Sequence, residues 1–390
     1  MTLRTTFTRL PDDIIIEISK SECLNNSDLF HCSLVSRKFV EGVNLLLHEQ
    51  VRVVVYHGQS ESEEDDDDND VVRCEYSPKT WKLLRSLIDH SKLQQLVQSI
   101  NFILYDCTLA GRSDEPAIET ALLPAFSSFL RYCRNAKKVK FDDGWKVSIV
   151  ELKIITQLIN IGELSMDGTS VEDLKFISKQ LPRIKHFHAS TFLSSSTPTQ
   201  LQSQSVTYPT NLESLALSLR SPEYHKAFVS ANYSTLRYLS IPVEVAARRI
   251  EYSRLSQLLT LRLTNVCGPS EKLSSTVGTK FWRSLSRSPS LRCLVLLEVT
   301  YFNSYEEVLF GPHLRPDNTI STLRTVRFGE GIPFDRVNLL LSGPLGATLH
   351  HVVVSERFVV GDLDVYTKNR FNFLSGICQE RGIEVVLEPW

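Results

Sequence analysis

The chain has 390 residues, of which 42% are hydrophobic and 23% are charged, so it can bury a large core and is too long for one compact domain unless that domain is elongated. Its formal net charge of -2 at pH 7 excludes a bulk attraction to nucleic acid or to an anionic membrane surface. The 8 cysteines are scattered without a CxxC pair, no apolar run approaches the roughly 18 residues of a membrane span, and no signal peptide is evident. We therefore expect reduced thiols, a location in the cytoplasm, the nucleus or both, and no membrane segment.

The first fifty residues predict three short amphipathic helices. Pro11 suits the first turn of the first helix because its missing N–H costs nothing there, and the two aspartates that follow are favourable beside a helix N-terminus. Residues 25–27 and Ser36 are of types that cap the second and third helices. A bundle of about forty residues is near the lower limit for burying its own core, so part of its apolar surface is expected to dock on a partner. The alternative is that these helices only cap the domain that follows.

The segment from Leu10 to Phe39 combines a proline, an acidic pair and apolar residues in a definite order. The positions concerned are Leu10-Pro11, Asp12-Asp13, Ile14, Ile18, Leu24, Asp28-Leu29, Cys32-Ser33-Leu34-Val35-Ser36-Arg37 and Phe39. In order and spacing they resemble the F-box motif, and residues 1–50 are interpreted as an F-box. The resemblance implies that these helices bind a Skp-type adaptor, which connects them to a cullin in a ubiquitin ligase. The adaptor-binding residues that it implies are Leu10, Pro11, Ile14, Ile18, Leu29, Val35 and Phe39. Many F-boxes have tryptophan where this chain has Phe39, so the buried area is smaller.

An acidic block follows the first predicted strand, which begins at residue 51. Almost every residue from 61 to 70 is Asp or Glu, and because like charges repel, a disordered loop is expected over about residues 57–72. Ser60 and Ser62 are candidates for modification by an acid-directed kinase, although a solvated insertion is the favoured interpretation. The first strand and this loop are assigned to residues 51–80. After Ser77-Pro78, apolar residues again follow the spacing of a helix.

An LxxLxL pattern, in which an apolar residue is followed by others at +3 and +5, recurs through residues 81–390. Its copies begin at Val97, Ala136, Ile161, Ile184, Leu212, Leu236, Leu258, Leu291, Leu323, Leu349 and, weakly, Gly382. Helical patterns lie between the copies, so the sequence predicts an α/β fold in which a strand-then-helix unit repeats. This unit resembles the leucine-rich repeat, which implies an irregular solenoid of parallel strands with outer helices. The asparagine that commonly follows such strands is missing. The alternative is a chance recurrence in a leucine-rich α/β protein.

Strand alternation predicts which side chains face a partner. Residues at +3 and +5 are expected in the core, and those at +2 and +4 on a concave sheet face. The candidate substrate-binding residues on that face are Lys138, Lys140, His186, His188, Tyr238, Arg262, Arg327 and His351. Cations and histidines outnumber acids there, which favours an acidic or phosphorylated segment of a protein substrate. The alternative is a solvated face without ligand preference.

No catalytic constellation is evident. Gly329-Glu330-Gly331 begins like a nucleotide loop, but Pro333 breaks the helix that should follow. His186 and His188 lie on one side of a predicted strand without a nearby cysteine or carboxylate to complete a zinc set. The basic run at residues 131–140 is too short to indicate a nucleic-acid site. No catalytic residue, metal or cofactor is therefore expected.

The patterns together favour a non-catalytic substrate-receptor subunit of a Skp/cullin/F-box ubiquitin ligase. The expected partners are a Skp-type adaptor, a cullin reached through it, and a protein substrate that the sequence does not identify. The alternative is an interaction protein that binds an adaptor or another partner without promoting ubiquitination. An enzyme on an α/β solenoid is a third class, but no nucleophile and base pair supports it.

Overall fold

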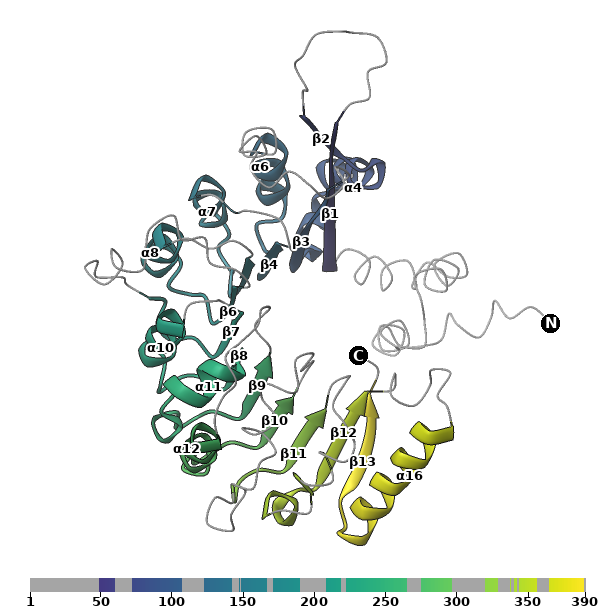
Figure 1. The fold of residues 1–390 in the computed structure, drawn as a ribbon. Helices are drawn as coiled ribbons and strands as arrows, with labels where there is room; N and C mark the ends of the chain where they lie inside the picture. Colours follow the sequence, from purple (N-terminus) through teal and green to yellow (C-terminus); the bar gives the residue numbers. More distant parts are fainter. Residues whose placement is uncertain are drawn as a thin grey trace, which may run out of the picture. The chain divides into compact units, whose positions relative to one another are not determined.

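The computed structural model describes a large part of the chain (Figure 1). The described residues are 49–59, 72–106, 123–141, 147, 149–166, 171–189, 208–218, 222–264, 275–296, 320–328, 337, 340–341, 344–355 and 365–388. The expected F-box at residues 1–50 lies outside this part except for its last two residues, and so do all seven expected adaptor-binding residues. Residues 60–71 of the expected acidic loop also lie outside it.

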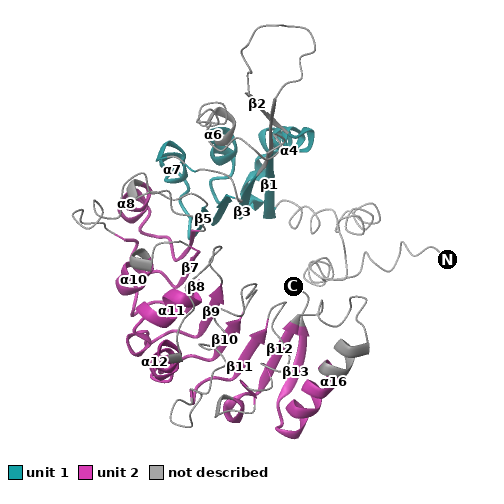
Figure 2. Ribbon diagram, in the orientation of Figure 1, with its two compact units in different colours: residues 1–168 teal, residues 169–390 magenta. Residues whose placement is uncertain are grey.

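The chain divides into two compact units, residues 1–168 and residues 169–390 (Figure 2). Each unit combines parallel strands with helices, so the expected α/β class is confirmed in both.

In the described part of residues 1–168, five strands form a mixed sheet. The strands are β1 (Gln50–Gln59), β2 (Val72–Tyr76), β3 (Ser99–Asp106), β4 (Lys138–Phe141) and β5 (Glu163–Met166). Their order is β2-β1-β3-β4-β5, and all neighbours are parallel except the antiparallel pair of β1 and β2. The helices are α4 (Pro78–Asp89), α5 (Ser91–Leu96), α6 (Leu123–Tyr132) and α7 (Ile149–Ile155). The sequence did not predict β2, because its pairing with the end of β1 is a non-local interaction.

The beginning of α4 follows from its local sequence. The Ser77 hydroxyl oxygen accepts a hydrogen bond from the Thr80 backbone N–H at 3.1 Å, and Pro78 occupies the first turn. The Thr80 hydroxyl in turn accepts a bond from the Val54 N–H at 3.0 Å, which ties the helix to β1.

Among the described residues of 169–390, eight strands are parallel and lie in the order of the sequence. They are β6 (His186–Ala189), β7 (Ser214–Leu217), β8 (Tyr238–Pro242), β9 (Thr260–Thr264), β10 (Cys293–Leu296), β11 (Thr325–Phe328), β12 (His351–Ser355) and β13 (Glu384–Glu388). The helices are α8 (Val171–Gln180), α10 (Pro222–Ala231), α11 (Val243–Arg249), α12 (Ser275–Leu285), α16 (Val365–Glu380) and the short 3-10 helices η3 (Tyr252–Arg254) and η5 (Pro344–Thr348). In Figure 1, α10, α11 and α12 lie along one side of these strands.

The LxxLxL residues form the core of both units. In every copy from Val97 to Leu349 the first residue and those at +3 and +5 are at most 4% exposed. The alternation predicted for these strands is therefore confirmed. The weak copy at Gly382 differs, because Leu387 is 39% exposed and, among the described strands, β13 has a neighbour on one side only. Aromatic contacts join the layers, as where the rings of Phe187 on β6 and Phe228 on α10 stack at 5.8 Å.

A buried asparagine ties the end of α10 to the residues before β7. Asn232 is 1% exposed, and its Oδ1 accepts a hydrogen bond from the Leu212 N–H at 2.8 Å. Its Nδ2 donates to the carbonyls of Pro209 and Phe228, both at 2.9 Å. Polar contacts thus support the apolar packing at this point of the second unit.

Candidate functional site

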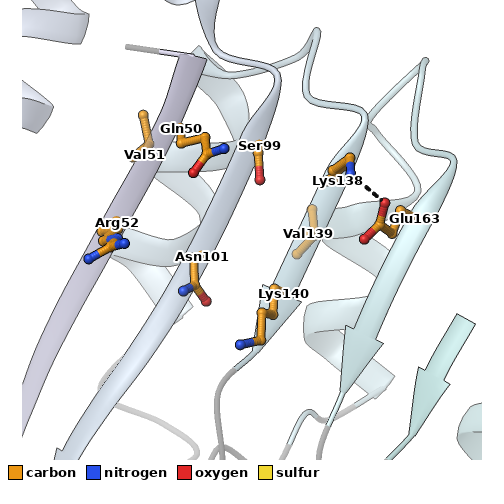
Figure 3. Close-up of a pocket in the computed structure, with 9 residues that line it drawn as sticks. All are labelled: Gln50, Val51, Arg52, Ser99, Asn101, Lys138, Val139, Lys140 and Glu163. Carbon is orange, nitrogen blue, oxygen red and sulfur yellow. Dashed lines mark ion pairs between the residues drawn. The ribbon is translucent and has the colours of Figure 1, made fainter. Parts of the chain in front are cut away.

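A polar hollow lies on the sheet face of residues 1–168 (Figure 3). It has a volume of about 240 Å³ and is lined by Gln50, Val51, Arg52, Ser99, Asn101, Lys138, Val139, Lys140 and Glu163. These residues come from β1, β3, β4 and β5, whose parallel register fixes which of them are neighbours. One row across the strands is Gln50, Ser99, Lys138 and Glu163, and the next is Arg52, Asn101 and Lys140.

The hollow has a cationic lining. Three of its residues are basic and one is acidic, and the Lys138 Nζ lies 2.8 Å from the Glu163 Oε2. Both of these side chains are well exposed, so their ion pair contributes little stability, at most about 1 kcal/mol. In the other row Asn101 lies between Arg52 and Lys140 (Figure 3). The Asn101 Oδ1 is buried without a hydrogen-bond partner in the described structure. This lining suits an anionic group that also brings a hydrogen-bond donor.

The sequence identified only part of this hollow. Lys138 and Lys140 were predicted as exposed candidates, and both are exposed. Arg52 and Asn101 were not singled out. The same alternation rule, applied to the copy at Val97, would have found Ser99 and Asn101. Arg52 needed the register of β1 against β3, which no local pattern supplies.

The other six candidates lie on the strands of residues 169–390. His186 and His188 are exposed on β6, whereas Tyr238, Arg262, Arg327 and His351 are half-buried on β8, β9, β11 and β12. The structure therefore divides the eight candidates between the two units, with two in the first and six in the second.

The register of the second unit places the candidates in two rows. His186, Tyr238 and His351 belong to the row that begins each strand, and the His351 Nδ1 lies 3.0 Å from the Glu384 Oε2 on β13. Arg262 and Arg327 belong to another row and have Val295 between them. The Arg262 Nε is buried without a hydrogen-bond partner in the described part of the chain, so it can still donate to a ligand carboxylate if neighbouring side chains move.

The face of the second unit is less solvated than alternation predicts. The residues expected to be exposed with Arg262 and Arg327 include Ser240, Val295 and Val353, which are 5%, 6% and 3% exposed. The expectation of an open face was wrong at these three positions. Adjacent strands are only about 5 Å apart, so the larger side chains on the neighbouring strands cover the smaller side chains of these three residues.

The metal-ligating side chains and the cysteine thiols of the described residues bear on catalysis. Among them, no three His, Cys, Asp or Glu side chains gather in a way that could hold a metal ion. Burial raises the pKa of the Cys133 thiol to about 12 and that of Cys378 to about 11, which removes the thiolate that nucleophilic chemistry needs. None of the helices within the described ranges is long and apolar enough to cross a membrane.

The fold and its polar faces define a class, an α/β protein of repeated strand-and-helix units whose sheet surface carries cationic and hydrogen-bonding side chains. Comparison of the chain with protein-family models and with curated proteins finds no match.

Proposed function

We propose that this chain is the substrate-receptor subunit of a Skp/cullin/F-box ubiquitin ligase. The observation that carries the proposal is the run of residues from Leu10 to Phe39, whose order and spacing resemble those of an F-box and which comes before the first strand. Residues 1–50 bind the Skp-type adaptor, and the sheet faces of the two units bind a target protein.

The repeated parallel units support this role. Ten buried LxxLxL strands with intervening helices are the arrangement that an irregular leucine-rich-repeat solenoid requires, and solenoids present extended binding surfaces. A receptor of this kind needs no reactive side chain of its own, because it accelerates ubiquitin transfer by holding the target near the ligase. The reduced thiols of Cys133, Cys293 and Cys378 fit a reducing compartment, the cytoplasm or the nucleus.

The hollow in the first unit gives the target-binding role a physical basis. Arg52 and Lys140 on either side of Asn101 suit a carboxylate or phosphate group on the target, because guanidinium and ammonium groups form charge-assisted hydrogen bonds with such oxygens. Arg262 and Arg327 extend the same preference to the second unit.

The first experiment is co-purification of the full chain with a Skp-type adaptor. We expect the wild type to bind and Ile14→Asp and Val35→Asp to lose binding, because a charge in an apolar interface core costs more than the roughly 2 kcal/mol of a truncated anchor. Ile14→Leu and Val35→Ile are the matched controls and should retain binding. Circular dichroism must show that all four variants remain folded.

Two outcomes separate the candidate functions. If the wild type fails to bind the adaptor, residues 1–50 only cap the following domain and the receptor proposal is wrong. If it binds but a reconstituted ligase does not ubiquitinate proteins captured by the chain, it is an interaction protein rather than a receptor.

A further inference from the structure

Four basic residues and one leucine lie side by side at the beginning of five successive strands of the second unit. Arg237, Leu259, Arg292, Arg324 and His350, which we call the arginine stripe, each directly precede a strand, from β8 to β12. Their backbones form a continuous ladder in which each N–H donates to the carbonyl of the previous member at 2.8 to 2.9 Å. The backbones of the five residues are therefore held side by side at one end of the strands, outside the sheet-face rows described above.

The arginine stripe is exposed, and its arginines make no ion pair among the described residues. Its basic members are all exposed, and Leu259 is 39% exposed. Other surface cations of this chain pair with carboxylates, for example Lys138 with Glu163 and Lys185 with Glu213. In contrast, no ion pair reaches the three arginines of the stripe within the described part of the chain.

The acids at the two ends of the stripe already have partners. Glu213 is the next residue of the ladder before Arg237, and the Lys185 Nζ lies 2.6 Å from its carboxylate. The hydrogen bond from Lys185 and the charge of Lys185, with a smaller contribution from the charge of Arg237, hold the pKa of Glu213 below its usual range. At the other end, the Glu384 N–H donates to the His350 carbonyl, and the Glu384 carboxylate contacts His351. The stripe is thus a cationic strip with an acid at each end.

One member of the stripe is held in place. The Arg324 Nη1 donates to the carbonyls of Ser321, Leu323 and Thr348 at 2.9, 3.1 and 3.3 Å. A guanidinium fixed in this way loses less conformational entropy when it binds a carboxylate. The Arg324 side chain is therefore partly preorganised to bind a carboxylate.

The dimensions of the stripe fit a short extended peptide. Neighbouring strands are about 4.8 Å apart, so the four steps from Arg237 to His350 span about 19 Å. This is the length of about six residues of extended chain. Carboxylates of such a segment can reach the arginines, and the exposed Leu259 between Arg237 and Arg292 offers an apolar contact. A long polyanion such as nucleic acid is disfavoured, because it would meet Leu259 in the middle and a carboxylate at each end.

We propose that the arginine stripe binds a short, extended, carboxylate-rich segment of a partner protein, with one apolar side chain of that segment placed on Leu259. The stripe contains none of the expected F-box residues and none of the sheet-face candidates of the proposed receptor. It is therefore independent of whether the chain acts in a ubiquitin ligase.

The test is fluorescence anisotropy of the full chain with a short labelled peptide of glutamates around one leucine. We expect binding that weakens as salt is added, because the contacts are exposed and electrostatic. Arg292→Glu should weaken binding at least about tenfold, which is the effect of losing one charge-assisted hydrogen bond of about 1.4 kcal/mol. Arg292→Gln, which removes the charge without repulsion, should weaken binding by about tenfold. Arg283→Glu makes the same change of charge at an exposed position on α12 and should leave binding unchanged.

Several results would overturn the proposal. One is that the wild type does not bind the peptide, and another is that Arg283→Glu weakens binding as much as Arg292→Glu does. A third is that a peptide with glutamine in place of glutamate binds as tightly as the glutamate peptide. A fourth is that a phosphoserine peptide or a single-stranded oligonucleotide binds more tightly than the glutamate peptide. Melting curves establish that the variants are folded. Adaptor co-purification of Arg292→Glu should match the wild type, so failure of this proposal is distinguishable from failure of the receptor proposal.

Discussion

Replacing Asn232 by alanine is expected to lower the free energy of unfolding of residues 169–390 by about 2 to 4 kcal/mol. The side chain is 1% exposed and makes three hydrogen bonds, to the Leu212 N–H and to the carbonyls of Pro209 and Phe228. Alanine removes all three. A buried polar group left without a partner costs about 1 to 3 kcal/mol. The Leu212 N–H and the Pro209 carbonyl lie outside the helix, and water entering the vacated space keeps the cost of each near the lower end of that range, so the two together account for the predicted loss.

Urea unfolding followed by tryptophan fluorescence measures this change. Trp282 is fully buried in the same unit, so its emission reports the loss of that core. Asn160→Ala, at an exposed asparagine of residues 1–168, is the control and should change stability by no more than about 0.5 kcal/mol. If Asn232→Ala were no more destabilising than this control, the three bonds would not hold the end of α10 to the residues before β7, and the reasoning would be refuted.

Two further predictions concern other buried groups. Because burial raises the pKa of Cys133 to about 12 and that of Cys378 to about 11, both should resist iodoacetamide at pH 8 in the native protein, and mass spectrometry should find the half-exposed Cys293 alkylated sooner. Their labelling should rise only as the pH approaches these raised values, and rapid labelling at pH 8 would contradict their burial. Tyr252→Phe removes a buried hydroxyl that donates to the Ala246 carbonyl at 3.1 Å, so calorimetry should find a loss of about 1 kcal/mol, and an unchanged melting temperature would count against that bond.

The hollow and the arginine stripe suggest how the proposed receptor would select a target. The hollow around Asn101 is compact and suits a single anionic group, whereas the arginine stripe is extended and suits several carboxylates in a row. They lie in different units and can be tested by separate substitutions. If the target binds one of these surfaces, its capture should weaken as salt is added. Charge reversal at that surface should abolish this salt dependence, whereas charge reversal at the other surface should not.

Part of this protein was determined by its sequence alone. The spacing of apolar residues in copies such as Leu236-Leu239-Ile241 predicted the core and the parallel strands, because strand alternation is a local property with a period of two. The same rule identified Lys138 and Lys140 as exposed.

Only the tertiary structure decided how the strands lie beside one another. It placed Arg52 and Lys140 on either side of Asn101, paired β2 with β1, and aligned Arg237 with Arg292 at the ends of their strands. These contacts join residues that are far apart in the chain, so no local pattern contains them. The register of backbone hydrogen bonds between strands is the physical reason that charged residues far apart in the sequence lie together in the hollow and in the arginine stripe.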